Sequence, residues 1–138
     1  MFTKPYAIRD WDDLGCGHYQ ASRGSRLHNG IDFCAEPDEK LVTPVSGVVT
    51  KLGYCYGDDL SYRYVEVTGT SDRRHRFFYI SPGVQVGEIV TAGETALGCV
   101  QDIAARYKHR GFMNNHFHYE VLLESGGYVN PELALVES

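Results

Sequence analysis

The sequence lacks any long apolar run. Among its 138 residues there is no stretch of eighteen apolar side chains, the length that a membrane-spanning helix needs. The start of the chain, MFTKPYAIRDWDD, has neither the charged and apolar regions of a secretory signal nor an Arg- and Ser-rich amphipathic pattern. Basic residues are also few: 13 Lys and Arg face 18 Asp and Glu, and a net charge of −5 repels phosphate backbones. We therefore expect no membrane span, no signal peptide in the given chain and no nucleic-acid partner.

Cysteine is present, but in no metal-binding pattern. Cys16, Cys34, Cys55 and Cys99 are widely spaced and include no CxxC pair, which argues against a structural zinc site built on thiolates. Two interpretations remain open. Either all four cysteines are free, partly buried thiols, or Cys16 and Cys34 form one disulfide.

Length and composition predict one globular domain. A chain of 138 residues with 43% hydrophobic and 22% charged residues is long enough to bury a core. We expect a single domain over residues 1–138. Within it, residues 1–23 form an extended N-terminal arm and residues 24–135 form the core.

Short β-rich runs predict a mostly β fold. Fifteen glycines and ten tyrosines fall in or between these runs, which are punctuated about every ten residues. The expected strands lie near Gly30–Phe33, Gly47–Leu52, Tyr62–Thr68, Arg76–Ile80, Thr95–Cys99 and Asn115–Leu123.

A turn and a helix can be placed between these strands. The polar segment Gly69–Arg74 is typical of a hairpin turn, so the strands on either side of it are expected to pair antiparallel. One short helix is predicted over Asp102–Lys108, because Asp102 is a good N-cap and Gly111 follows soon after the end. A second helical turn is expected at Pro131–Leu135.

The first cluster of chemically active residues is the run His28–Asp32. On a straight strand His28 and Asp32 share a face but lie about 13 Å apart, too far to bind one ion. Gly30 between them tolerates the backbone bend that would bring the two side chains together. Taken alone, the pattern equally fits a surface histidine that enters an ordinary strand.

The second cluster is the run His116–Val121. Side chains alternate along a strand, so His116 and His118 point to one face about 6–7 Å apart while the residues between them point into the core. This spacing suits a metal ligand beside a catalytic group, and it also suits a polar face in solvent. Together the clusters supply two histidines and one aspartate, which with a water form a hydrolytic zinc shell.

Five segments in order resemble the lysostaphin/LytM-type zinc metallopeptidases. They are His28–Asp32, Leu41–Val49, Val86–Gly98, His116–Val121 and Val129–Pro131. A narrower resemblance is to a branch that includes bacterial and phage-associated proteins and the vertebrate leukocyte cell-derived chemotaxin. It is carried by Gly15–His28 and Phe78–Pro82.

The family resemblance implies a compact antiparallel β-sheet core with a groove and long loops. In that groove zinc would be held by His28, Asp32 and His118, with His116 beside it as a catalytic base or transition-state stabiliser. The substrate implied is a peptide crosslink of bacterial peptidoglycan. Glu120 shares a strand face with His118, so we expect it to bind the second ring nitrogen of that histidine.

The chain departs from the family pattern at Ser81. Active members carry a histidine in a YxH element, and the corresponding segment here is Tyr79-Ile80-Ser81. A serine hydroxyl holds no positive charge and exchanges no proton near pH 7, so reduced activity is expected. His109, in the loop that leads to His116, is a candidate substitute for the absent histidine.

Two classes of function follow. The first is a zinc-dependent peptidase that cleaves peptidoglycan crosslinks outside the cell, in the periplasm or on a virion. The alternative is a zinc-stabilised module that binds a peptide, glycan or receptor without cleaving it, or a structural part of a phage tail.

Overall fold

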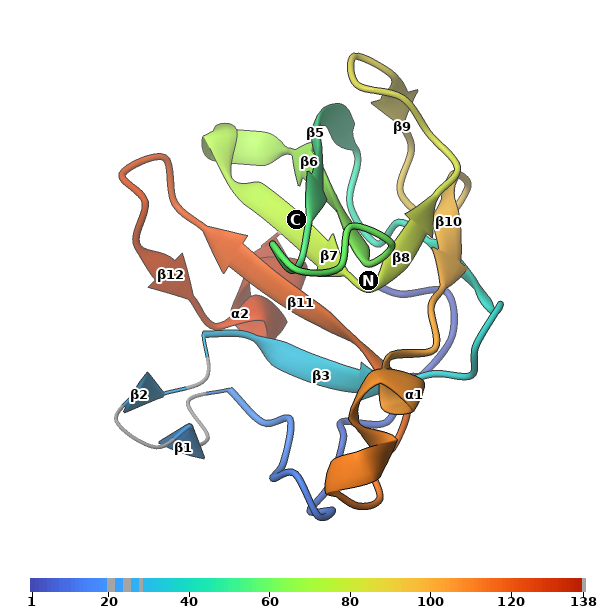
Figure 1. Ribbon diagram of the computed structural model, residues 1–138. Coiled ribbons are helices and arrows are strands. Elements are labelled where there is room, and N and C mark those ends of the chain that lie inside the picture. Colours follow the sequence, from blue (N-terminus) through green and yellow to red (C-terminus); the bar gives the residue numbers. More distant parts are fainter. Residues whose placement is uncertain (20–21, 24–25, 28, 138) are drawn as a thin grey trace.

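Short strands make up most of the regular structure in the computed structural model, which describes residues 1–19, 22–23, 26–27 and 29–137 (Figure 1). The strands are β1 (Ser22–Arg23), β2 (Arg26–Leu27), β3 (Ile31–Cys34), β4 (Lys40–Val42), β5 (Gly47–Tyr54), β6 (Arg63–Thr68), β7 (Arg74–Phe78), β8 (Ile80–Pro82), β9 (Ile89–Val90), β10 (Ala96–Val100), β11 (His116–Leu122) and β12 (Tyr128–Val129). The helices are α1 (Ile103–Tyr107) and α2 (Pro131–Glu137), with 3-10 turns η1 (Thr70–Asp72) and η2 (Lys108–Arg110).

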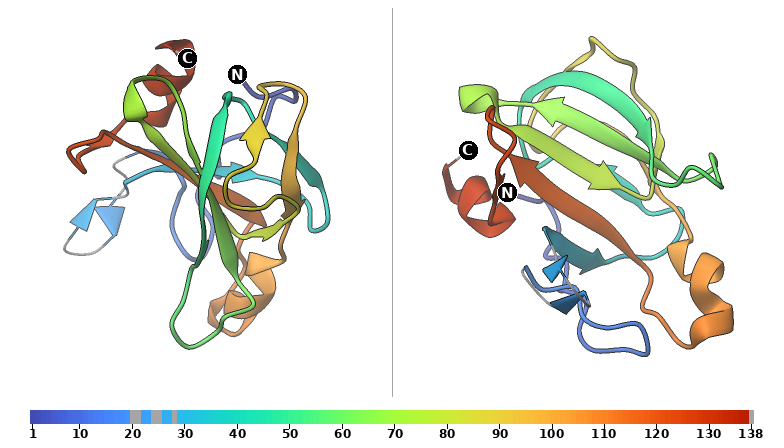
Figure 2. Two further views of the ribbon diagram at one scale, coloured as in Figure 1. Left: turned by 90° about the horizontal axis from the view of Figure 1, so that it is seen from above. Right: turned by 60° about the vertical axis from the view of Figure 1, so that its left-hand side comes forward.

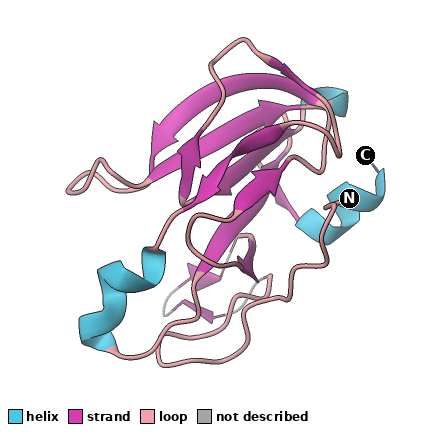
Figure 3. Cartoon of the chain, turned by 90° about the vertical axis from the view of Figure 1, so that its right-hand side faces the viewer, coloured by secondary structure: helices cyan, strands magenta, loops and turns pink. Residues whose placement is uncertain are grey.

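Two sheets form the body of the molecule. The larger sheet has the order β12-β11-β7-β6-β5-β9, and β3 also pairs with β11, along His116–Tyr119. The smaller sheet has the order β4-β10-β8. Each pairing among the described strands is antiparallel. Figure 2 shows the long strands of the larger sheet side by side, with α1 at the start of β11. Figure 3 shows the helical segments at the edges of the β structure.

One apolar core lies under the larger sheet. Alternate residues of each strand point inward, so the core-facing positions of β11 are Phe117, Tyr119 and Val121, each fully buried. The smaller sheet adds buried side chains such as Leu41 and Leu97. The opposite face of β11 is polar and carries His116, His118 and Glu120 at the alternate positions.

The N-terminal segment lies along β3. The backbone N–H of Arg9 donates to the carbonyl of Asp32 (2.7 Å), and the N–H of Asp32 donates to the carbonyl of Gly17 (2.8 Å). The Phe2 ring packs edge-on against Phe33, with 5.3 Å between ring centroids. The part of the chain expected to form an arm thus packs on the core and adjoins the strand that carries Asp32.

The predicted mostly β fold is confirmed. The hairpin turn at Gly69–Arg74 joins β6 and β7, which pair antiparallel as expected. The predicted helix is α1, where the side chain of Asp102 accepts a hydrogen bond from the backbone N–H of Ala105 (3.1 Å). The helical turn expected at Pro131–Leu135 is the start of α2.

Two details differ from the expected elements. The strand expected over Arg76–Ile80 is broken into β7 and β8, because Tyr79 adopts a left-handed backbone conformation (φ 67°) that interrupts the pleat. Strands β1, β2, β4, β9 and β12 were not predicted, since runs of two or three residues carry no clear alternation. Cys34, Cys55 and Cys99 are free thiols in the structure, so the alternative disulfide between Cys16 and Cys34 is not formed. No helix in the described ranges is long and apolar enough to cross a membrane.

Candidate active site

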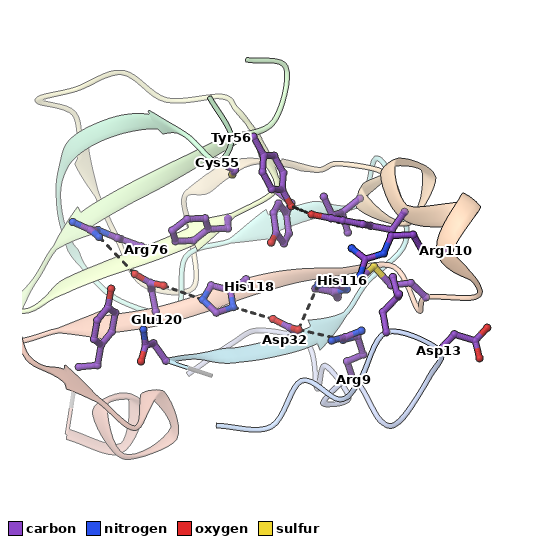
Figure 4. Close-up of a pocket in the computed structure, with 18 residues that line it drawn as sticks. Arg9, Asp13, Asp32, Cys55, Tyr56, Arg76, Arg110, His116, His118 and Glu120 are labelled. Atoms are coloured by element: carbon purple, nitrogen blue, oxygen red, sulfur yellow. Dashed lines mark hydrogen bonds and ion pairs between the residues drawn. The ribbon is translucent and has the colours of Figure 1, made fainter. Parts of the chain in front are cut away.

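A cavity of about 750 Å³ opens over the polar face of β11 (Figure 4). Asp32 of β3 and the alternate residues His116, His118 and Glu120 of β11 lie along it. Arg9 reaches it from the N-terminal segment. Much of the remaining wall is aromatic, and it includes Cys55, Tyr56, Phe78, Tyr79, Ile103, Tyr107, Arg110, Met113 and Tyr128.

His118 sits between two carboxylates. Its Nδ1 lies 2.9 Å from Oδ1 of Asp32, its cross-strand neighbour, and its Nε2 lies 2.9 Å from Oε1 of Glu120. Ionised carboxylates only accept hydrogen bonds, so both ring nitrogens donate and the ring is a cation. Burial alone would lower the pKa of His118, but these hydrogen bonds raise it to about 9. Glu120 therefore contacts His118 as the sequence led us to expect.

His116 is held in the other protonation state. Its Nδ1 lies 2.8 Å from the backbone carbonyl of Asn114, which can only accept, so Nδ1 carries the ring proton. Nε2 is then the unprotonated nitrogen, 3.5 Å from Oδ2 of Asp32. Burial lowers the pKa of His116, although the charge of Asp32 opposes this shift. The ring is a neutral base whose reactive nitrogen faces the carboxylate.

A buried arginine holds Asp32 from behind. The Nε of Arg9 donates to Oδ2 of Asp32 (3.2 Å), and one terminal nitrogen donates to both oxygens of Asp12 (3.1 Å each). The side chains of Arg9, Asp12 and Asp32 are only 3%, 1% and 5% exposed. Asp12 in turn accepts from the backbone N–H of Asn114, two residues before His116. The N-terminal segment therefore fixes both the carboxylate of Asp32 and the backbone that leads into β11.

A second buried network holds Glu120. Arg76 of β7 lies 3.6 Å from Glu120 and donates to Glu66 of β6 (2.8 Å). Across the two described networks four carboxylates (Asp12, Asp32, Glu66 and Glu120) are ion-paired to two arginines. The His118 cation offsets one of the two remaining negative charges. A His118 ring that binds a metal is neutral, and the excess is then two negative charges, the charge of one divalent cation.

Two glycines make room for this arrangement. A Cβ at Gly30 would overlap the carbonyl oxygen of Tyr119 and lie 2.8 Å from Cε1 of His118. A Cβ at Gly17 would overlap the side chain of Asp32. Both positions therefore require glycine. At Gly30 the reason is the close approach to His118, in addition to the backbone bend expected there.

The structure separates the sequence-predicted residues into three groups. Asp32, His116, His118 and Glu120 are brought together. His28, the third expected ligand, lies outside the described residues, and within the described ranges no three His, Cys, Asp or Glu side chains are arranged to hold a metal. Ser81 and His109 are exposed and do not line the cavity.

Ser81 does not line the described cavity, for a reason of strand geometry. On β7 the residues Arg76 and Phe78 face the cavity, whereas His75 and Phe77 face the core. The break at Tyr79 then turns that side chain into the cavity, and Ser81 lies in the other sheet, paired with β10. His109 is likewise displaced because η2 directs its neighbour Arg110, not His109, into the cavity.

Several site residues were not found by sequence reasoning. Arg9 and Arg76 belong to no motif, and their role follows only from the pairing of distant segments. Tyr56 lines the cavity and likewise belongs to no motif. Tyr79 and Tyr107 also line it. The left-handed backbone of Tyr79 has no sequence signal, since neither glycine nor asparagine occupies that position.

No family model and no curated protein matches the sequence. Solved structures do match in three dimensions. The catalytic domain of the antimicrobial peptidase lysostaphin from Staphylococcus simulans aligns with a TM-score of 0.67 at 20% identity, covering 95% of this chain and 92% of that one. A catalytic-domain mutant of the prophage-encoded M23 protein EnpA from Enterococcus faecalis gives 0.67 at 19% identity, covering 96% and 93%.

A zinc-containing peptidase from Vibrio cholerae aligns with a TM-score of 0.58 at 18% identity, covering 90% of this chain and 35% of that one. The chain spans about half, 51%, of a longer lysostaphin structure. The identities are low, so the likeness concerns the backbone arrangement. This chain has the fold of the lysostaphin-type M23 peptidase domains.

Proposed function

We propose that this protein is a zinc-dependent endopeptidase that cleaves peptide crosslinks of bacterial peptidoglycan. The observation that carries the proposal is the cluster of Asp32, His116 and His118 in a large cavity, within the fold of peptidase catalytic domains. A role at the cell wall places its action outside the cell, in the periplasm or on a virion.

The charge and chemistry of the cluster fit a zinc ion. Carboxylate oxygen and imidazole nitrogen are usual zinc ligands, and the two buried networks carry the negative charge that one divalent cation would neutralise. Asp32 and His118 would hold the ion, with His28 as the third ligand. When bound, zinc polarises a peptide carbonyl and lowers the pKa of water, which amide hydrolysis requires.

His116 supplies the proton transfers in this proposal. Its Nδ1–H is held by the carbonyl of Asn114, which leaves Nε2 free to accept a proton from the attacking water. The water oxygen bonds to the carbonyl carbon, the peptide C–N bond breaks, and His116 returns the proton to the leaving nitrogen. The lowered pKa of His116 keeps the ring neutral before the reaction.

The experiment is digestion of purified cell walls, followed by loss of turbidity and by mass spectrometry of the released peptides. We expect hydrolysis with zinc and none after chelation. His118→Ala should lose both zinc and activity, His116→Ala should lose activity but keep zinc, and the exposed His109→Ala should match the wild type. Zinc-loaded wild type that binds cell walls but releases no peptides would instead establish a binding module.

A further inference from the structure

Tyr79 lines the cavity with a strained backbone. It has a left-handed backbone (φ 67°), which costs a residue other than glycine about 1–3 kcal/mol. Two backbone hydrogen bonds hold this conformation: its N–H donates to the carbonyl of Arg63, and its carbonyl accepts from Gln101, each at 2.8 Å. The consequence is that Phe78 and Tyr79, although consecutive, both line the cavity. An unbroken strand would have sent Tyr79 to the core side.

The Tyr79 side chain is built into the site. Its ring packs edge-on against His116, with 5.6 Å between centroids and 83° between planes. Its ring also stacks on Tyr56 (6.4 Å, 12°). Burial and the nearby Asp32 charge raise its pKa, so the hydroxyl stays protonated at physiological pH.

Three tyrosines cluster at this wall of the cavity. The Tyr107 hydroxyl donates to the Tyr56 hydroxyl across 2.7 Å, and the Tyr56 ring stacks on the Tyr79 ring. These contacts, together with the packing against His116, fix the position of the Tyr79 ring that carries the hydroxyl.

Two of the three arginines that line the described cavity are already engaged. Arg9 is bound to Asp12 and Asp32, and Arg76 to Glu66 and Glu120. The third, Arg110, has its guanidinium 5.9 Å from the centre of the Tyr107 ring, whereas the Tyr79 ring packs directly against His116. The Tyr79 hydroxyl is therefore a donor carried by a residue in contact with His116.

We propose that Tyr79 is a catalytic residue whose hydroxyl donates a hydrogen bond to the peptide carbonyl oxygen as negative charge develops on it. This inference rests on the proposed peptidase function. The hydroxyl keeps its proton throughout, so His116 alone moves protons. A donor that strengthens its hydrogen bond in the transition state raises kcat without tightening substrate binding.

The test is Tyr79→Phe, which keeps the ring against His116 and removes only the hydroxyl. We expect kcat on a peptidoglycan peptide to fall roughly 10²-fold with KM within about two-fold, as when one oxyanion donor is lost. Zinc content and Tm should match the wild type. Tyr56→Phe should give a smaller loss, since it keeps the ring stacked on Tyr79 and removes only the hydroxyl bound to Tyr107. Tyr64→Phe, a buried tyrosine of β6 that does not line the cavity, is the matched control.

A second measurement does not depend on turnover. A phosphinic peptide, which carries a tetrahedral anion in place of the cleaved bond, should bind Tyr79→Phe more weakly than wild type, by about the factor lost in kcat. An uncleaved peptide should bind His116→Ala and His116→Ala/Tyr79→Phe equally. If wild type hydrolyses the substrate and Tyr79→Phe keeps its kcat and phosphinate affinity, the role of Tyr79 is refuted and the peptidase function stands. If zinc-loaded wild type neither cleaves nor binds the phosphinate, both proposals fail.

Discussion

Replacing Arg9 by glutamine removes the cation that two buried carboxylates share. The Arg9 side chain is 3% exposed and its nitrogens lie 3.1–3.2 Å from Asp12 and Asp32. Removing one partner of a buried ion pair costs about 3–5 kcal/mol, because the remaining charge is kept from water. Glutamine can donate one hydrogen bond to either carboxylate, so we expect Arg9→Gln to lower the free energy of unfolding by about 3 kcal/mol.

The matched control is Lys4→Gln. Lys4 makes a shorter ion pair, 2.7 Å to Glu39, but its side chain is 56% exposed. An exposed ion pair contributes about 0–1 kcal/mol to stability. We therefore expect Lys4→Gln to lower the free energy of unfolding less than Arg9→Gln, although the ion pair of Lys4 is shorter. The assay is urea unfolding of chelator-treated protein at pH 7.5, followed by circular dichroism. Equal losses for Arg9→Gln and Lys4→Gln would refute the reasoning, since the buried network would then contribute no more than a surface contact.

Three further predictions concern Gly30, the buried His75 and the YxH element. Gly30→Ala should lower the free energy of unfolding by about 1–3 kcal/mol and reduce zinc binding, because the new Cβ meets the His118 ring. The control Gly57→Ala should do neither, because its Cβ meets no described atom within 4 Å. Equal stabilities of the two variants would contradict this prediction. His75 is buried against the Tyr119 hydroxyl (2.7 Å), and burial lowers its pKa from 6.5 to about 4. The unfolded chain therefore binds the extra proton first, and stability is lost as pH falls from 6.5 to 4, by about 3 kcal/mol for this group. His75→Gln should flatten that part of the pH dependence in urea unfolding and the exposed His109→Gln should not; an unchanged slope in His75→Gln would exclude a buried neutral histidine. Ser81→His should change cell-wall hydrolysis less than two-fold, because the side chain at this position is exposed on β8; a ten-fold gain would show that Ser81 reaches the cavity.

The fold could be predicted where local signals were strong. Alternation in His116–Val121 placed the histidines and Glu120 on one face and the aromatic residues in the core, as the structure has them. The Asp102 cap located α1. Pairing of β3 with β11, by contrast, joins Asp32 to His118 across 86 residues. No local pattern specifies that contact, and only the ordered family motifs indicated it.

The YxH element shows where sequence reasoning failed. On one uninterrupted strand Ser81 would face the same side as His75, which is the core side. Ser81 could therefore lie beside the cavity only if the strand were broken between them. The break occurs, but at Tyr79, and it turns the tyrosine into the cavity in place of the serine. A left-handed tyrosine is set by tertiary hydrogen bonds to Arg63 and Gln101, which sequence propensity does not encode.

The role of the N-terminal segment could not be predicted for the same reason, because it depends on tertiary contacts. In the sequence, residues 1–14 belong to none of the segments that carry the family resemblance. In the structure Arg9 and Asp12 are among the most buried charges, and they connect Asp32 to the backbone that precedes His116. Buried charges of opposite sign persist only where they satisfy one another, so each member constrains the position of the next. The site is therefore fixed by its two β11 histidines together with an N-terminal segment whose Arg9 holds the carboxylate of Asp32 in place.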